Sequence, residues 1–143
     1  MNIKHLTLAV AVGLTLPGLA AGQTSPLPAG FTTQPLLKSG TTRDNEPIAY
    51  PTGKPEVIAV IGTLDLGGRT ALHLHPVPVY VHVLDGEIEL RTEGAAPQRY
   101  KAGMSFIESL NRKHQAFNVA DRPSRLLVVF IGEAGKPTTV AVP

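Results

Sequence analysis

The sequence predicts a single all-β domain, a sandwich or barrel of short antiparallel strands. The chain has 143 residues, which is the size of one domain with one hydrophobic core. Its 14 glycines and 13 prolines suit a fold with many turns. After residue 22 no segment has the apolar period of an amphipathic helix, whereas short apolar runs recur about every ten residues. This spacing is typical of sandwiches and barrels.

The predicted strands differ in how much water they should contact. Val57–Ile61 is β-branched and apolar, and we expect a buried strand there. Residues 85–86 are Asp-Gly, a strong hairpin signal, and Glu87–Leu90 then alternates polar and apolar residues. That alternation places Glu87 and Glu89 on the solvent side. The other strands are expected at residues 70–75, 79–84, 98–100, 104–108, 113–118, 125–131 and 138–142.

Two segments before these strands have a different composition. Residues 1–22 have the layout of a secretory signal peptide: a basic start, a short apolar run at Leu6–Leu16 and a small-residue region. The alternative is an N-terminal core helix. The run is shorter than the ~20 apolar residues that span a bilayer, so we expect no stable membrane anchor and a periplasmic or secreted protein. Residues 23–55 are rich in proline and are expected to form an extended arm, which leaves residues 56–143 for the barrel.

Charge and cysteine content exclude several classes of function. The formal net charge is only +2 and the basic residues are scattered, so we expect no nucleic-acid partner. The chain has no cysteine, which excludes disulfides and thiol nucleophiles. It also has neither a glycine-rich phosphate loop nor a nucleophile elbow. The chemistry must therefore rest on other side chains.

Three histidines are the main candidates for that chemistry. His73 and His75 are two residues apart on a predicted strand, so both side chains should point to the same face. His114 lies on a later predicted strand and could converge with them through the fold. Three imidazoles can bind a transition metal and leave positions open for water or a substrate. The alternative is that they are packed or surface histidines without a ligand.

The sequence around the first two histidines resembles the first motif of the cupin superfamily. That motif runs Gly, five residues, His-x-His, three or four residues, Glu, six residues, Gly. Gly67, His73, His75 and Gly86 fall on this spacing. Val79 occupies the position of the glutamate, and valine cannot coordinate a metal.

The sequence around the third histidine resembles the second cupin motif. That motif runs Gly, five residues, Pro-x-Gly, two residues, His, three residues, Asn, and Gly103, His114 and Asn118 fit it. Ser109 stands in place of the proline. Asn111 stands in place of the glycine, and asparagine tolerates the left-handed conformation better than most residues.

The resemblance implies a single-domain, RmlC-like cupin jelly-roll β-barrel with a divalent metal on His73, His75 and His114. The metal would be Fe, Zn, Ni, Cu or Mn. Three neutral ligands would leave the full 2+ charge of the ion and favour an anionic or chelating small-molecule ligand. Some cupin oxygenases use three histidines around Fe(II), whereas cupins with decayed motifs bind no metal.

These implications leave two functions open. One is an exported, metal-dependent enzyme of a dioxygenase-like or hydrolytic kind, with no catalytic residue yet assigned. The other is a non-catalytic small-molecule or metal-binding module of the cell envelope. Cupins often dimerise by pairing or exchanging edge strands, so a homodimer that uses residues 23–55 is a further hypothesis.

Four other side chains are predicted to lie outside the metal site. If Val79 faces inward, the strand period turns His82 outward, where it is a structural or surface residue rather than a ligand or proton donor. Glu108 could place a carboxylate near the barrel, but we predict a solvated glutamate. Tyr80 and Phe106 are predicted core residues rather than substrate platforms.

Overall fold

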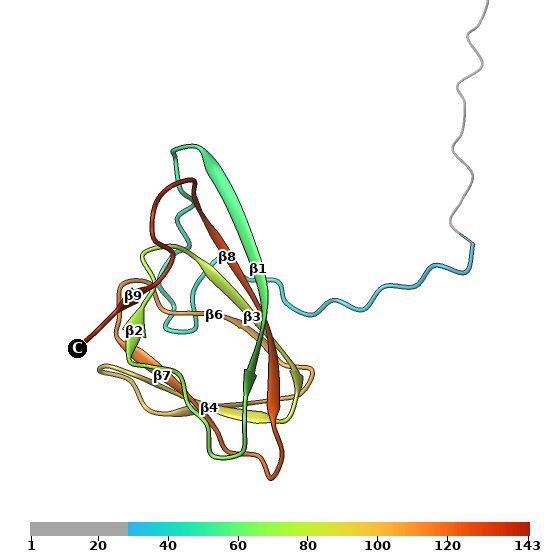
Figure 1. The fold of residues 1–143 in the computed structure, drawn as a ribbon. Coiled ribbons are helices and arrows are strands. Elements are labelled where there is room, and N and C mark those ends of the chain that lie inside the picture. Colours follow the sequence, from blue (N-terminus) through green and yellow to red (C-terminus); the bar gives the residue numbers. More distant parts are fainter. Residues whose placement is uncertain (1–28) are drawn as a thin grey trace, which may run out of the picture. The chain divides into compact units, whose positions relative to one another are not determined.

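Nine strands form two antiparallel sheets in the part of the chain that the structure describes, residues 29–143 of a computed structural model (Figure 1). The predicted signal peptide lies outside the described residues. The first sheet has the order β1 (Pro55–Leu64), β8 (Ser124–Glu133), β3 (Val79–Asp85), β6 (Ser105–Ile107). The second has the order β5 (Gln98–Lys101), β4 (Glu87–Thr92), β7 (His114–Asn118), β2 (His73–Leu74), β9 (Val140–Ala141).

The all-β prediction is confirmed, and the sheet order is that of a jelly roll. Neighbouring strands far apart in sequence, such as β1 with β8 and β4 with β7, show that the chain crosses repeatedly between the two layers. Among the described residues no helix is long and apolar enough to cross a membrane.

The core lies between the inner faces of the two sheets. On β3, Val79, Val81 and Val83 are buried and point inward, while the residues between them are more exposed. On β4, Ile88 and Leu90 are buried in the same alternation. Every second residue of β3 and β4 thus fills the barrel.

Three predictions about single side chains can be compared with this core. Phe106 is buried and stacks on the Tyr100 ring, with ring centroids 3.8 Å apart, as predicted for a core residue. Tyr80 is half-buried on the outer face instead, because it alternates with the inward Val79 and Val81. Glu89 also points outward, as predicted, and its carboxylate pairs with Arg91 and Arg99.

The turns agree with the glycine positions of the two motifs. Gly86 has a φ of 75°, and a side chain there would collide with Ser124. Asn111 has a φ of 53°, the left-handed conformation expected where the family has glycine. The backbone at these two turns fixes the direction in which the following strands leave.

A strand forms at Val57–Ile61 as predicted, but the prediction that this strand is buried is wrong. These residues do form part of β1, but all of them are solvent-exposed. The side chain of Val57 is 64% exposed and that of Ile61 is 51% exposed. The reason is topological: β1 is an edge strand that pairs only with β8, and no strand among the described residues pairs with its other edge.

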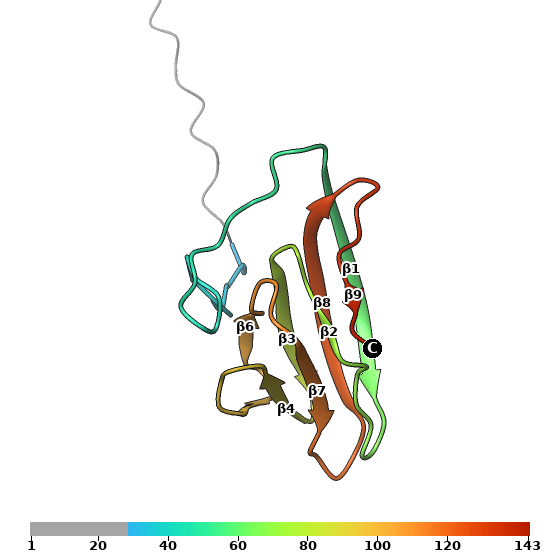
Figure 2. The ribbon, with the colours of Figure 1, turned by 90° about the vertical axis from the view of Figure 1, so that its left-hand side faces the viewer.

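Part of the proline-rich arm docks on the barrel. A turn closed by the Thr41–Pro47 bridge lies beside β6, and the Arg43 amide donates to the Ile107 carbonyl at 2.8 Å (Figure 2). The Arg43 side chain is only 5% exposed. Its guanidinium donates to side-chain oxygens of Thr92, Tyr100 and Gln98 at 2.7, 3.1 and 3.1 Å.

Candidate metal centre

The fold brings the three predicted histidines together on one sheet. His73 on β2 pairs directly with His114 at the start of β7, and His75 follows β2 on the same face. Their ring centroids are 4.4 Å apart for His73–His114, 4.7 Å for His73–His75 and 5.0 Å for His75–His114. The strand alternation that predicted a shared face therefore holds.

Each of the three rings is oriented by its Nδ1 atom, which lies within hydrogen-bonding distance of a backbone carbonyl oxygen. The carbonyl partners are Ala71 at 2.7 Å for His73, Thr138 at 2.8 Å for His75 and Arg112 at 2.9 Å for His114. A carbonyl can only accept, so these contacts assign the proton to Nδ1 in all three rings. The lone pair of each Nε2 is then free, which is the arrangement of metal-binding histidines.

Among the residues that the structure describes, no protein group donates a hydrogen bond to these free Nε2 atoms. Nε2 of His73 and Nε2 of His75 are 3.2 Å apart, and two lone pairs cannot bond each other without a proton or an ion between them. Nε2 of His114 is fully buried and has no hydrogen-bond partner. A buried polar atom without a partner costs about 1–3 kcal/mol, so something must satisfy it.

Glu108 completes the cluster, and the prediction that it is solvated is wrong. Its Oε2 is 2.9 Å from Nε2 of His75 and 3.6 Å from Nε2 of His114, and its side chain is 10% exposed. The reason is the strand period: Phe106 points inward on β6, Ile107 outward and Glu108 inward again. The two-residue spacing from Phe106 was the sequence signal that could have located it.

The pKa values show how the metal-free cluster is charged. Burial raises the pKa of Glu108, but the adjacent imidazoles of His114 and His75 lower it by more, and the net result is a pKa of about 2. Burial lowers the pKa of His114, yet the Glu108 carboxylate outweighs this and the net shift is upward. Burial lowers the pKa of His73. The centre therefore holds an ionised carboxylate at neutral pH, beside imidazoles whose Nε2 atoms can bind a cation in place of a proton.

The donor set fits a divalent transition metal. Three Nε2 donors lie within 4.8 Å of one another, and Glu108 contributes an oxygen. Two donors bound at about 2.1 Å to one ion, at angles of about 90–110°, lie about 3.0–3.4 Å apart. The separations of 2.9, 3.2 and 3.6 Å are close to this range. His73, His75, His114 and Glu108 are thus the residues that would hold a metal.

A cavity of about 160 Å³ lies beside this cluster. Its titratable side chains among the described residues are His73, His75 and Glu108, all of them in the donor set. The rest of the wall is apolar apart from Thr70 and Thr139. The apolar lining residues are Val60, Val81, Ile88, Ala116, Leu126, Val128 and Phe130.

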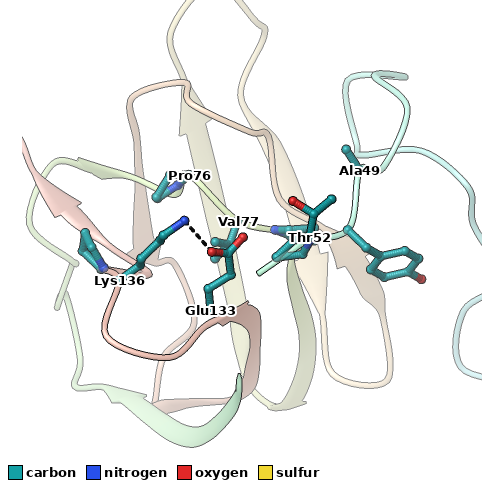
Figure 3. Close-up of a pocket in the computed structure, with 10 residues that line it drawn as sticks. Ala49, Thr52, Pro76, Val77, Glu133 and Lys136 are labelled. Atoms are coloured by element: carbon teal, nitrogen blue, oxygen red, sulfur yellow. Dashed lines mark ion pairs between the residues drawn. The ribbon is translucent and has the colours of Figure 1, made fainter. Parts of the chain in front are cut away.

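A wider groove of about 440 Å³ lies elsewhere on the surface and is lined by none of the three histidines (Figure 3). An ion pair between Glu133 and Lys136 stands on one side, and Ala49 and Thr52 lie on the other. Its walls hold no cluster of donor atoms comparable to the histidine site, so the chemistry belongs to the smaller cavity.

His82 does not join the cluster. It points to the outer face of the first sheet, where its Nδ1 is 2.8 Å from Oγ of Ser105. The Tyr80 hydroxyl shares the same serine at 3.0 Å. The prediction that His82 faces away from the barrel interior is confirmed.

The sequence of the barrel matches that of one family. A family model described as a cupin domain matches residues 60–130. The chain belongs to the cupin superfamily. No curated protein matches this cupin.

Solved structures resemble this cupin over its barrel. The DMSP lyase DddQ from Ruegeria pomeroyi has a TM-score of 0.53 and 26% identity, over 60% of this chain and 43% of that one. An oxalate decarboxylase from Lactobacillus farciminis has a TM-score of 0.52 and 21% identity, over 60% and 26%. A double-stranded beta-helix protein from Klebsiella pneumoniae has a TM-score of 0.51 and 20% identity, over 67% and 90%. The cupin thus spans less than half of the two enzymes.

Proposed function

We propose that this cupin is an exported, metal-dependent enzyme, oxygenase-like in its chemistry, that acts on a small molecule. The observation that carries the proposal is the convergence of three Nε2 lone pairs and one ionised carboxylate, with His114 Nε2 left without any other partner. A divalent metal would be held by His73, His75, His114 and Glu108. When bound, it would supply Lewis acidity and, if it is Fe, Cu or Mn, redox chemistry.

The chain's own residues would position this metal and keep its surroundings dry. The carbonyl groups that accept from the three Nδ1 atoms fix the tautomer and the direction of each ring. The Glu108 carboxylate neutralises one of the two charges of the ion. The remaining single positive charge supports a substrate that offers one anionic or chelating group.

The side chains that line the cavity support oxygenase-like chemistry over lyase or hydrolase chemistry. Lyase or hydrolase chemistry uses a proton-transferring side chain, and the titratable groups that line the described cavity are already metal donors. In an oxygenase the reactivity comes from the metal and dioxygen, so no separate acid or base is needed. The apolar wall and the small volume favour a compact substrate with an apolar body.

The similar structures support enzymatic activity in a general way. The DMSP lyase and the oxalate decarboxylase are enzymes by name, and the first has 26% identity to this cupin. The rival function is a non-catalytic small-molecule or metal-binding module of the cell envelope. The absence of a separate acid or base in the described cavity wall is compatible with it as well.

Two measurements on the chain without residues 1–22 test the proposal. Elemental analysis should find about one Fe, Zn, Ni, Cu or Mn per chain, and replacing His73, His75 and His114 together by alanine should remove it. Metal retained by the triple variant would refute the site. Oxygen consumption across a panel of phenols, diketones and thiols should identify a substrate, whereas a fully loaded protein that consumes none favours the binding module.

Export is tested separately from the metal. The full chain should be recovered from the periplasm or medium with an N-terminus near residue 23, as read by N-terminal sequencing. A protein that keeps residue 1 and stays in the cytosol would contradict this part of the proposal. The metal assignment does not depend on that result.

A further inference from the structure

Thr70 is a polar side chain in the apolar wall of the cavity, and it does not belong to the metal donor set. It lies before β2 and is half-buried. Its backbone N–H donates to the carbonyl oxygen of Ala116 at 3.0 Å, and its own carbonyl oxygen accepts from the side-chain amide of Gln115 at 2.9 Å. These contacts with β7 hold Thr70 in one place.

The Thr70 hydroxyl uses its oxygen but not its hydrogen. Its Oγ1 accepts a hydrogen bond from the backbone N–H of Ala116 at 3.1 Å. Among the residues that the structure describes, no group accepts the hydrogen of this hydroxyl. Support for the backbone of Ala116 needs only the oxygen, so the hydrogen is available to a molecule in the cavity.

The Thr70 hydroxyl lies at a different level of the barrel from the histidines. Its partner Ala116 is two residues after His114 on β7, and both side chains are buried. Two residues of a strand span about 7 Å. Thr139, the other hydroxyl of the cavity wall, lies at the level of the histidines, because its Oγ1 is 3.2 Å from Nδ1 of His75. A molecule bound at the histidines would therefore meet Thr70 with its far end.

We propose that Thr70 is a specificity-determining residue, which selects small organic anions that carry a second oxygen acceptor, such as a carbonyl or ether oxygen, a few bonds from the anionic group. The inference rests on the proposed function, because the anionic group would bind the metal. The Thr70 hydroxyl would donate to the second oxygen. The apolar side chains of the wall would contact the carbon chain between the two groups.

The small size of the cavity makes this hydrogen bond selective. Its volume of about 160 Å³ is that of about five water molecules, so a bound molecule leaves little room for water beside it. A molecule without the second oxygen would displace the water that satisfies the Thr70 hydroxyl and leave its hydrogen unpaired. A site with a fixed donor discriminates against the analogue that lacks the acceptor. Thr139 is exposed, so water can satisfy its hydroxyl in either case.

Titration of the Co(II)-loaded chain without residues 1–22 with two matched pairs of acids tests the proposal. The pairs are pentanoate with 4-oxopentanoate and hexanoate with 5-oxohexanoate. The members of each pair have the same chain length and differ in one carbonyl group. The Co(II) absorption bands report binding without any turnover. We expect the oxo acid of at least one pair to bind about tenfold more tightly than its partner.

Three variants separate recognition from a structural role. T70V keeps the branched shape but removes the hydroxyl, so it should lose the preference for the oxo acid, whereas T70S should retain it. A merely structural loss would weaken both acids of a pair alike. T63V is the matched control, because Thr63 is exposed on β1 and does not line the cavity. Circular dichroism checks that all three variants stay folded.

Equal affinity of the wild type for both members of both pairs would overturn the proposal, and this comparison needs no variant. A preference that persists in T70V, or a T70V that binds both acids more weakly by the same factor, would also overturn it. A chain that takes up Co(II) but binds none of the four acids refutes the inference and leaves the metal site standing. A chain that takes up no Co(II) refutes the proposed function, and this inference with it.

Discussion

The backbone N–H of Glu108 donates a 2.9 Å hydrogen bond to the carbonyl oxygen of Val79. Val79 begins β3 and Glu108 directly follows β6, next to the paired residues Tyr80 and Ile107, and both Val79 and Glu108 are buried. Val79 holds the position where the first cupin motif has glutamate. The carboxylate that is missing from β3 is thus replaced by one that reaches the histidines from the adjacent strand.

Removing this carboxylate should weaken metal binding. In E108Q the shape is kept but the charge and the good oxygen donor are lost, so we expect the affinity to fall by about 100-fold or more. Competition with a chromophoric chelator measures the dissociation constant. The double variant V79E/E108V should recover a large part of the affinity, because it moves the carboxylate to its neighbour. Wild-type affinity in E108Q would contradict the assignment of Glu108.

Asp44 should act on the metal centre without touching it. Its carboxylate lies 2.9 Å from the Arg112 guanidinium and accepts a hydrogen bond from the Ser109 hydroxyl. Ser109 follows Glu108, and the Arg112 carbonyl orients His114. The docked turn of the arm thus fixes the loop that carries two of the four donors.

The variant D44N should therefore bind metal about tenfold more weakly, since groups that orient ligands typically contribute 10- to 100-fold to affinity. D121N is the matched control, because the Asp121 side chain is 93% exposed. Equal metal affinity in D44N, D121N and wild type would show that Asp44 only supports the fold. Thermal melts of the metal-free variants separate the two roles.

The sequence predicted the convergence of the histidines because it depends on local rules. Strand alternation pairs His73 with His75, and the motif glycines set the turns that bring His114 back. The prediction for Glu108 was wrong because an isolated glutamate is usually solvated. Its spacing of two residues from the core residue Phe106 did indicate that both side chains point to the same face of the strand. The exposure of β1 could not be predicted, because the composition of a strand does not say whether it lies at the edge or in the middle of its sheet.

Two glycines of the motifs should differ in their tolerance of a side chain. Gly86 and Gly103 both have positive φ angles, of 75° and 87°, so alanine is strained by about 1–2 kcal/mol at either. Only at Gly86 would the new Cβ also collide with Ser124, whereas the space at Gly103 is open. We expect G86A to lower the free energy of unfolding clearly more than G103A. Urea denaturation measures both, and equal losses would contradict the collision.

The metal-free protein should lose stability in acid through Glu108. Its pKa is about 2 in the folded chain and about 4.3 when unfolded, so the unfolded state binds the proton first as the pH falls. The stabilisation is present above pH ~4.3 and is lost toward pH ~2. The shift corresponds to on the order of 3 kcal/mol. Urea denaturation in EDTA at several pH values should show the advantage of wild type over E108Q shrinking across this window. A difference that stays constant from pH 6 to pH 2.5 would mean that the carboxylate is not ionised against the histidines in the folded state.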